Sequence, residues 1–245
     1  MCEAGAALCS FVPGRIWYRE YAVRYAGMNL AARTTIVRLT SGDLFVHSPG
    51  PIDVNLRSRI GELGSVVHIV APGTFHYLHV AAWKRAYPDA VVWLCPGLRE
   101  KRPELPMGEQ LSDEAPTAWR DELDQVVIKG NRVIREVLFF DRISRTLIAT
   151  DSIENYGDRT LEVPRLLKFW WRLFRLWNRP ALAPEYGLGW CDRKAARASF
   201  ERALQWDFVR IILSHGDLIE DNARAQAALA WKNLLKATRP LENDM

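Results

Sequence analysis

The sequence contains no long hydrophobic run. Hydrophobic residues make up 49% of its 245 residues, yet no stretch approaches the ~20 consecutive apolar residues that a membrane-spanning helix needs. Residues 1–15 also lack the basic region followed by an apolar run that marks a secretory signal peptide. From these two absences we expect a cytoplasmic protein.

Closely spaced cysteines are also absent. The four cysteines are Cys2, Cys9, Cys95 and Cys191, and none of them forms a Cys-x-x-Cys pair. This spacing excludes a zinc knuckle and argues against a disulfide framework. Reduced thiols are therefore expected.

An excess of charge of one sign is missing as well. The formal net charge is +4, from 33 Lys and Arg against 29 Asp and Glu, which is too weak to predict nucleic-acid binding without a clustered basic face. The hydrophobic and charged fractions are those of an ordinary soluble domain. We therefore expect no nucleic-acid partner and a single domain over 1–245.

Short apolar runs alternate with helical patterns along the chain. The run at 66–71 is continuous and apolar, as in a strand buried on both faces, and with the helix and strand after it makes a β-α-β unit. The expected order is a β-hairpin (34–39 and 44–47), a helix (54–63), the β-α-β unit (66–71, 76–87 and 90–94), a meander of strands (126–150), two helices (161–177 and 194–205), a strand (208–213) and a helix (221–238). This order predicts an α/β fold, a four-layer αβ/βα sandwich of two mixed sheets flanked by helices.

Polar side chains follow three of the predicted core strands. His76 and His79 come after the strand at 66–71, Asp151 follows the meander, and His215 follows the strand at 208–213. Ligand sites in α/β folds lie at the edge where strands end. Residues three apart on a helix share one face, so both imidazoles are expected to point the same way. The sequence thus predicts one site built from these four residues.

Imidazole and carboxylate ligands together suit a divalent ion such as zinc, iron or manganese. In this interpretation His76, His79, Asp151 and His215 hold one ion, and Asp151 or His215 handles protons during hydrolysis. Other roles stay open, since such histidines also hydrogen-bond the backbone and Asp151 could serve as a turn residue. His47 is either an additional pocket residue or part of a turn.

Five fragments, taken in order, resemble the metallo-β-lactamase-like superfamily. They are 37–39, 47–49, the two-histidine stretch at 72–88, 144–151 and 213–216. The similarity spans roughly 28–235 and looks like the branch known only as domain of unknown function 4336. It implies an αβ/βα sandwich and a hydrolase-like metal site.

The family's ligand set is incomplete here. Its catalytic members carry His-x-His-x-Asp-His after the strand, whereas 71–79 reads Ala-Pro-Gly-Thr-Phe-His-Tyr-Leu-His and retains counterparts only in His76 and His79. Asp151 and His215 would match the family's metal-bridging Asp and final His, and 126–136 contains no histidine. The resemblance implies a degenerate site, so a two-metal centre is not expected. Two interpretations remain: a single-metal hydrolase acting on a small-molecule ester or related substrate, and a non-catalytic binding or interaction protein that has lost the metal centre.

Aromatic and basic residues alternate over 168–177, Lys-Phe-Trp-Trp-Arg-Leu-Phe-Arg-Leu-Trp. We expect an aromatic-rich helical insertion at about 161–190. Such a helix suits a membrane surface or a protein partner, with contact through Phe169, Trp170, Trp171 and Trp177. It could equally pack over the sandwich or act as a lid on the pocket.

Overall fold

Two mixed β-sheets form the centre of the molecule. The computed structural model describes residues 7–25, 27–160 and 163–236. Within these residues one sheet has seven strands in the order β1-β2-β3-β4-β5-β6-β7, and the other has four in the order β11-β10-β9-β8. The strands are β1 (Cys9–Val12), β2 (Ile16–Tyr25), β3 (Met28–Arg38), β4 (Asp43–His47), β5 (Ser65–Ala71), β6 (Val91–Leu94), β7 (Glu109–Gln110), β8 (Leu123–Val127), β9 (Val137–Asp141), β10 (Thr146–Ala149) and β11 (Arg210–Leu213).

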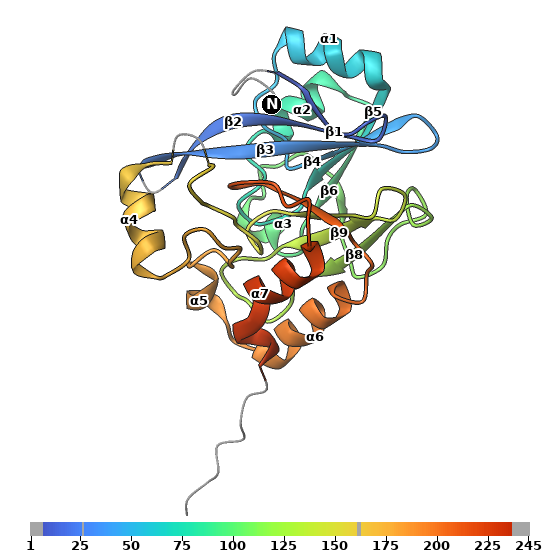
Figure 1. Cartoon of the computed structure of the whole chain (residues 1–245). Coiled ribbons are helices and arrows are strands. Elements are labelled where there is room, and N and C mark those ends of the chain that lie inside the picture. Colours follow the sequence, from blue (N-terminus) through green and yellow to red (C-terminus); the bar gives the residue numbers. More distant parts are fainter. Residues whose placement is uncertain (1–6, 26, 161–162, 237–245) are drawn as a thin grey trace, which may run out of the picture.

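Helices cover the outer face of each sheet. They are α1 (Val54–Leu63), α2 (Val80–Ala86), α3 (Leu98–Lys101), α4 (Arg165–Leu173), α5 (Tyr186–Gly189), α6 (Arg193–Ala203) and α7 (Ala223–Leu235). Helices α1 and α2 lie over the larger sheet, whereas α6 and α7 lie over the smaller one (Figure 1). This layering confirms the predicted αβ/βα sandwich of two mixed sheets.

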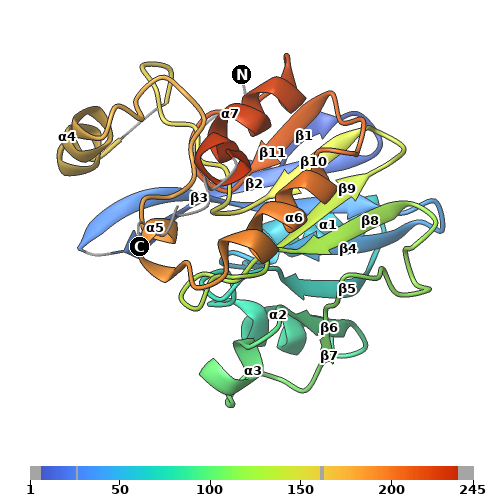
Figure 2. The same cartoon turned by 90° about the horizontal axis from the view of Figure 1, so that it is seen from below.

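Three apolar layers hold the sandwich together. One lies between the two sheets and includes Phe45, Trp119 and Phe139, while the others lie between each sheet and its helices. Figure 2 shows the two sheets from below, with α6 and α7 against the smaller one. Because both sheets are covered on both sides, their central strands are apolar on both faces.

Parallel pairing brings the carboxyl ends of several strands to one edge. In the larger sheet β4, β5 and β6 are parallel neighbours, and in the smaller sheet β10 is parallel to β11. Ala149 pairs with Leu213, so Asp151 and His215 each follow a paired position by two residues. The register alone therefore places these two side chains next to each other.

The N-terminal hairpin was not predicted. β2 and β3 pair antiparallel from Ile16 opposite Val37 to Tyr25 opposite Met28. The outer half of this hairpin extends beyond the body of the sandwich (Figure 1), and many of its side chains are only partly buried. Its sequence therefore lacks the alternation of apolar and polar residues that identifies a strand.

Other boundaries also differ from the predictions. Helix α2 begins at Val80 rather than at residue 76, and 133–134 lie in a loop. Helix α4 is shorter than the predicted helix over 161–177, of which 161–162 lie outside the described residues. Cys95 and Cys191 are free thiols, but Cys9 is disulfide-bonded. The expectation of reduced thiols is wrong for Cys9.

No helix in the described ranges is long and apolar enough to cross a bilayer.

Candidate metal centre

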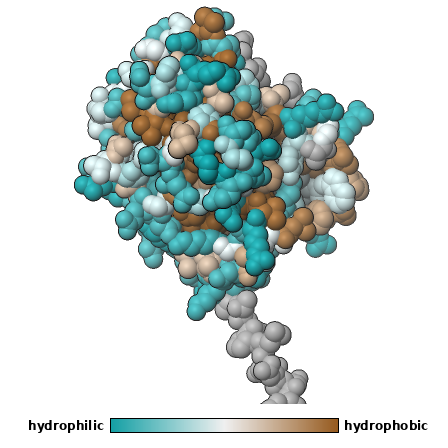
Figure 3. Space-filling model, turned by 180° about the vertical axis from the view of Figure 1, so that it is seen from behind, coloured by the Kyte–Doolittle hydropathy of each residue, from teal (hydrophilic) through white to brown (hydrophobic). Residues whose placement is uncertain are grey.

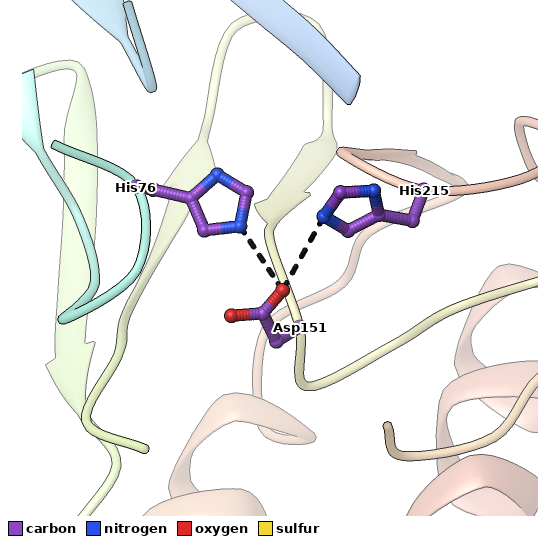
Figure 4. A group of neighbouring side chains, drawn as sticks. All are labelled: His76, Asp151 and His215. Atoms are coloured by element: carbon purple, nitrogen blue, oxygen red, sulfur yellow. Dashed lines mark hydrogen bonds and ion pairs between the residues drawn. The ribbon is translucent and has the colours of Figure 1, made fainter. Parts of the chain in front are cut away.

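His76, Asp151 and His215 converge at the strand-end edge of the sandwich. The Nε2 atom of His76 lies 3.0 Å from Oδ1 of Asp151, and Nε2 of His215 lies 3.4 Å from the same oxygen. In Figure 4 both imidazoles point toward this carboxylate from opposite sides. All three side chains are buried, and their three ligand-type atoms lie within 4.8 Å of one another. The spacing is small enough for one ion to bind all three.

The far nitrogen of each imidazole is held by another group. Nδ1 of His215 lies 2.9 Å from the carbonyl oxygen of Ala31, to which it donates a hydrogen bond. Nδ1 of His76 lies 2.8 Å from Oγ of Ser48. With both Nδ1 atoms engaged in this way, both Nε2 atoms face Asp151, and each would offer its lone pair to an ion once its proton is released. Metal-ligating histidines are typically oriented in this way by a second hydrogen bond.

A buried glutamate fixes the loop that carries Asp151. The carboxylate of Glu136 accepts hydrogen bonds from the backbone N–H groups of Thr150 (2.6 Å) and Ser152 (2.7 Å), which flank Asp151. It also accepts from the hydroxyl groups of Ser152 (3.1 Å) and Tyr186 (2.8 Å). Both carboxylate oxygens are therefore used to hold one turn of the chain.

The loop before α2 is fixed in a similar way. The Thr74 N–H donates to the carbonyl of Arg135, and the Val137 N–H donates to the carbonyl of Pro72. These contacts tie 72–76 to the segment that enters β9, so His76 lies in a loop rather than on a helix.

The charges within the cluster reinforce one another. Burial alone would raise the pKa of Asp151, but His76 and His215 outweigh it and hold that pKa well below its usual range. Burial would likewise lower the pKa of His76, but the Asp151 carboxylate reverses the effect and raises it. Asp151 is thus an anion at neutral pH, as a metal ligand must be.

A large pocket opens beside the three residues. It has a volume of about 860 Å³ and is lined by all three of them together with mostly apolar side chains. The β2–β3 hairpin contributes Tyr21 and Leu30, and α4 contributes Trp171. Pockets of this size and apolar character accept small-molecule ligands.

Two ionisable groups in this pocket have shifted pKa values. Burial, together with the charges of Asp151 and Glu185, raises the pKa of Glu154 well above its usual value. Burial also raises the pKa of Tyr21 to about 12, although a hydrogen bond with Ser48 acts in the opposite direction. Both side chains line the pocket. The raised pKa values favour the protonated, neutral forms of both groups, which face the same space as Asp151.

His79 and His47 do not join the cluster. His79 is the residue preceding α2, and its ring lies edge-on against Tyr21 with the ring centroids 5.9 Å apart. It does not share a helix face with His76 because the helix starts only after it. His47 ends β4, is 1% exposed, and neither of its ring nitrogens has a hydrogen-bond partner among the described residues. It lies edge-on against Phe139, between the sheets and outside the pocket lining.

Sequence reasoning missed Glu136, Glu154 and Tyr21. Glu136 stands in a stretch that was predicted to consist of strands and turns, with nothing to indicate that it reaches Asp151. An acidic residue directly before the apolar run of β9 was the only available signal. Tyr21 lies in the hairpin that the pattern of the sequence did not predict.

Solved structures of metallo-β-lactamases have the same fold as this chain. The DIM-1 enzyme superposes with a TM-score of 0.65 at 12% identity, covering 94% of this chain and 97% of that one. The mono-zinc form of FIM-1 from Pseudomonas aeruginosa gives 0.62 at 11%, covering 95% and 98%. The enzyme from Hirschia baltica gives 0.60 at 9%, covering 92% and 97%. The chain therefore has a metallo-β-lactamase-like fold, as the sequence resemblance implied.

Within this fold class the chain belongs to the family described as "Domain of unknown function (DUF4336)". The model of that family matches residues 13–169, more than half of the chain. The match includes His76 and Asp151 but ends before His215. A search of curated proteins found no match.

Proposed function

We propose that this protein is a single-metal hydrolase that acts on a small-molecule ester or a related substrate. The observation that supports this proposal best is the convergence of His76, Asp151 and His215 at the wall of a pocket of about 860 Å³. The proposed ligand set is these three residues. His79 is left out because its ring packs against Tyr21.

The donor set fits a divalent ion. Two neutral imidazoles and one carboxylate are a usual ligand set for catalytic zinc and for iron or manganese, and three protein ligands leave a coordination position open. When bound, such an ion would polarise the substrate carbonyl and lower the pKa of a water molecule to near neutrality. The hydrogen bonds from His215 to Ala31 and between His76 and Ser48 would keep both rings aimed at the ion.

The proton transfers of ester hydrolysis can be assigned to this chain's carboxyl groups. Water adds to the carbonyl carbon and loses a proton, for which the Asp151 carboxylate is the proposed acceptor. The bond from that carbon to the alcohol oxygen then breaks, and the departing oxygen needs a proton. Glu154 is the proposed donor, because its raised pKa favours the protonated form and its side chain lines the same pocket. His215 is a second candidate for proton transfer.

One observation favours a second candidate function. The carboxylate of Asp151 already has two imidazole partners within 3.4 Å, so this charge is stabilised without an ion. A non-catalytic binding protein that uses the apolar pocket would fit that arrangement.

Metal content separates the two candidates. The chain, purified without an affinity tag, should contain close to one equivalent of zinc, iron or manganese by elemental analysis. His76→Ala and His215→Ala should lose that metal together with hydrolysis of a p-nitrophenyl ester, because each removes one of three ligands.

His79→Ala is the matched control. It removes an imidazole three residues from His76 but outside the cluster, so it should retain both metal and activity. Metal-free wild-type protein with a normal circular dichroism spectrum would refute the hydrolase proposal and support the binding protein. Loss of metal from His79→Ala as complete as from His76→Ala would refute the three-residue site.

A further inference from the structure

Helix α4 has three distinct faces. Leu167 and Trp171 point inward, where Trp171 is 1% exposed and packs edge-on against Tyr156 with the ring centroids 4.9 Å apart. A second face is basic, and the third is apolar and exposed. That outer face consists of Leu166, Phe169, Trp170 and Leu173, which are 54%, 59%, 44% and 58% exposed. Their spacing of three or four residues places them along one stripe of the helix.

The exposed stripe continues into the pocket. Trp170 and Phe174 line the pocket, stack on each other with the ring centroids 5.7 Å apart, and are themselves partly exposed. Leu188 (86% exposed) and Leu78 (57% exposed) also line it. In Figure 3 hydrophobic side chains gather on the projecting part of the molecule at the right of the view, where α4 lies. The exposed stripe and the pocket that His76, Asp151 and His215 line therefore share apolar side chains.

Basic side chains flank this stripe. Arg165, Lys168 and Arg172 recur at helical spacing, and Arg175 follows the helix. Lys168 and Arg172 lie over the ring of Trp177, 5.0 and 5.3 Å from its centroid. Among the residues that the structure describes, the ion pair on this face joins Arg172 to the exposed Asp158, 3.7 Å away. The described residues of this face therefore carry more positive than negative charge.

We propose that α4 binds to an anionic lipid surface and that the pocket takes the apolar chain of an amphiphilic substrate from that surface. An amphipathic helix with aromatic and leucine side chains on one face and cations beside them is suited to the interface between lipid and water. The cations are complementary to anionic headgroups, which attract each nearby Lys or Arg. The pocket lies behind the same helix, so a chain that leaves the lipid enters it beside Trp170 and Phe174.

This inference deepens the proposed function by naming its substrate class, and its lipid-binding part does not depend on the metal. Of the four aromatic residues that the sequence predicts to contact a membrane or partner, Phe169 and Trp170 belong to the proposed lipid-binding face. Trp171 packs inward, and Trp177 is covered by two cations.

Vesicle flotation tests the lipid surface. The full chain should bind vesicles of phosphatidylcholine with 30% phosphatidylglycerol at least tenfold more strongly than vesicles of phosphatidylcholine alone, and 0.5 M NaCl should reduce this binding. Phe169→Ser combined with Leu173→Ser should weaken binding at least tenfold. The control is Val54→Ser combined with Ile143→Ser, which removes two apolar side chains elsewhere that are 84% and 55% exposed and should leave binding unchanged.

A monomeric probe tests the pocket separately. A fluorescent fatty acid with a twelve-carbon chain, below its aggregation concentration, should bind the chain and lose at least tenfold in affinity in Phe174→Asp, which places a charge at the pocket wall. Phe169→Ser with Leu173→Ser should bind this probe as wild type does, because neither residue lines the pocket.

Each outcome decides the proposal. Absence of vesicle binding, or equal binding by the outer-face and control variants, overturns the lipid surface. Concentration-dependent self-association that the outer-face variant loses would assign α4 to a second copy of this chain and overturn it as well. Vesicle and probe binding by a metal-free protein would refute the hydrolase while leaving this inference standing.

Discussion

At the scale of single residues, each proposed ligand is held by a neighbour that sequence reasoning did not identify. His215 is oriented by a backbone carbonyl, His76 by Ser48, and the loop of Asp151 by Glu136. Along the chain, Ser48 is 28 residues from His76, and Ala31 is 184 residues from His215. Candidate ligands could be found from residue type and position after a strand, but their supporting contacts could not.

Glu136→Gln tests the importance of this support. Glutamine keeps the size of the side chain but replaces one acceptor oxygen with an N–H donor, which would face the N–H of Thr150 or Ser152. The loop should shift, and metal affinity should fall about 10–100-fold. A competition titration with a chromophoric chelator measures this change.

Glu201→Gln is the control, because Glu201 pairs with the exposed Arg197 on the same helix, far along the chain from the loop of Asp151. An unchanged dissociation constant in a folded Glu136→Gln variant would show that this carboxylate does not position Asp151.

At the scale of elements, the site depends on two loops that follow parallel strands. The loop after β10 carries Asp151 and the loop after β11 carries His215, and they are joined by hydrogen bonds from the Asn155 N–H to the His215 carbonyl and from the Asp217 N–H to the Asn155 carbonyl. Between these contacts lies Gly216, which has a φ of +90°. The strands were predictable from their apolar runs, but this connection between loops was not.

Gly216→Ala should disturb the site through the backbone. A Cβ atom there would lie 2.3 Å from the carbonyl oxygen of Asn155, and a left-handed backbone already costs about 1–2 kcal/mol for a residue with a side chain. The free energy of unfolding should therefore fall by more than that amount, and metal binding should weaken. Urea denaturation and the chelator titration measure the two effects.

The matched variant is Gly187→Ala, since a Cβ atom at Gly187 meets nothing within 4 Å. This change should leave stability unchanged or raise it by up to ~1 kcal/mol. If the two variants are equally stable, the backbone at Gly216 does not constrain the site.

At the scale of the whole molecule, one buried histidine makes the stability of the sandwich depend on pH. Burial lowers the pKa of His47 to about 3, and the charge of His76 adds to this effect. In the unfolded chain its pKa is about 6.5. The unfolded state therefore binds the proton first as pH falls, so the contribution of His47 to stability is full above about pH 6.5 and is lost as pH falls toward 3.

His47→Leu should remove this dependence. The variant should be at least as stable as wild type at pH 7, because the two ring nitrogens of His47 have no hydrogen-bond partner within the described part of the chain. Between pH 6.5 and 4 the wild type should lose up to about 1.4 kcal/mol more per pH unit than the variant. Urea denaturation in the presence of EDTA measures both curves, and parallel curves would contradict the prediction.

The sequence by itself determined the fold class, because apolar runs and helical periodicity are local properties that predict the order of strands and helices along the chain. It also placed His76, Asp151 and His215 just after core strands. Only the tertiary structure decided that these three meet while His79 turns toward Tyr21, since the start of α2 is set by hydrogen bonds between 72–76 and the segment before β9. The pocket likewise depends on a hairpin and a helix that lie more than a hundred residues apart. The physical reason is that side-chain convergence arises from long-range pairing and packing, which no local pattern encodes.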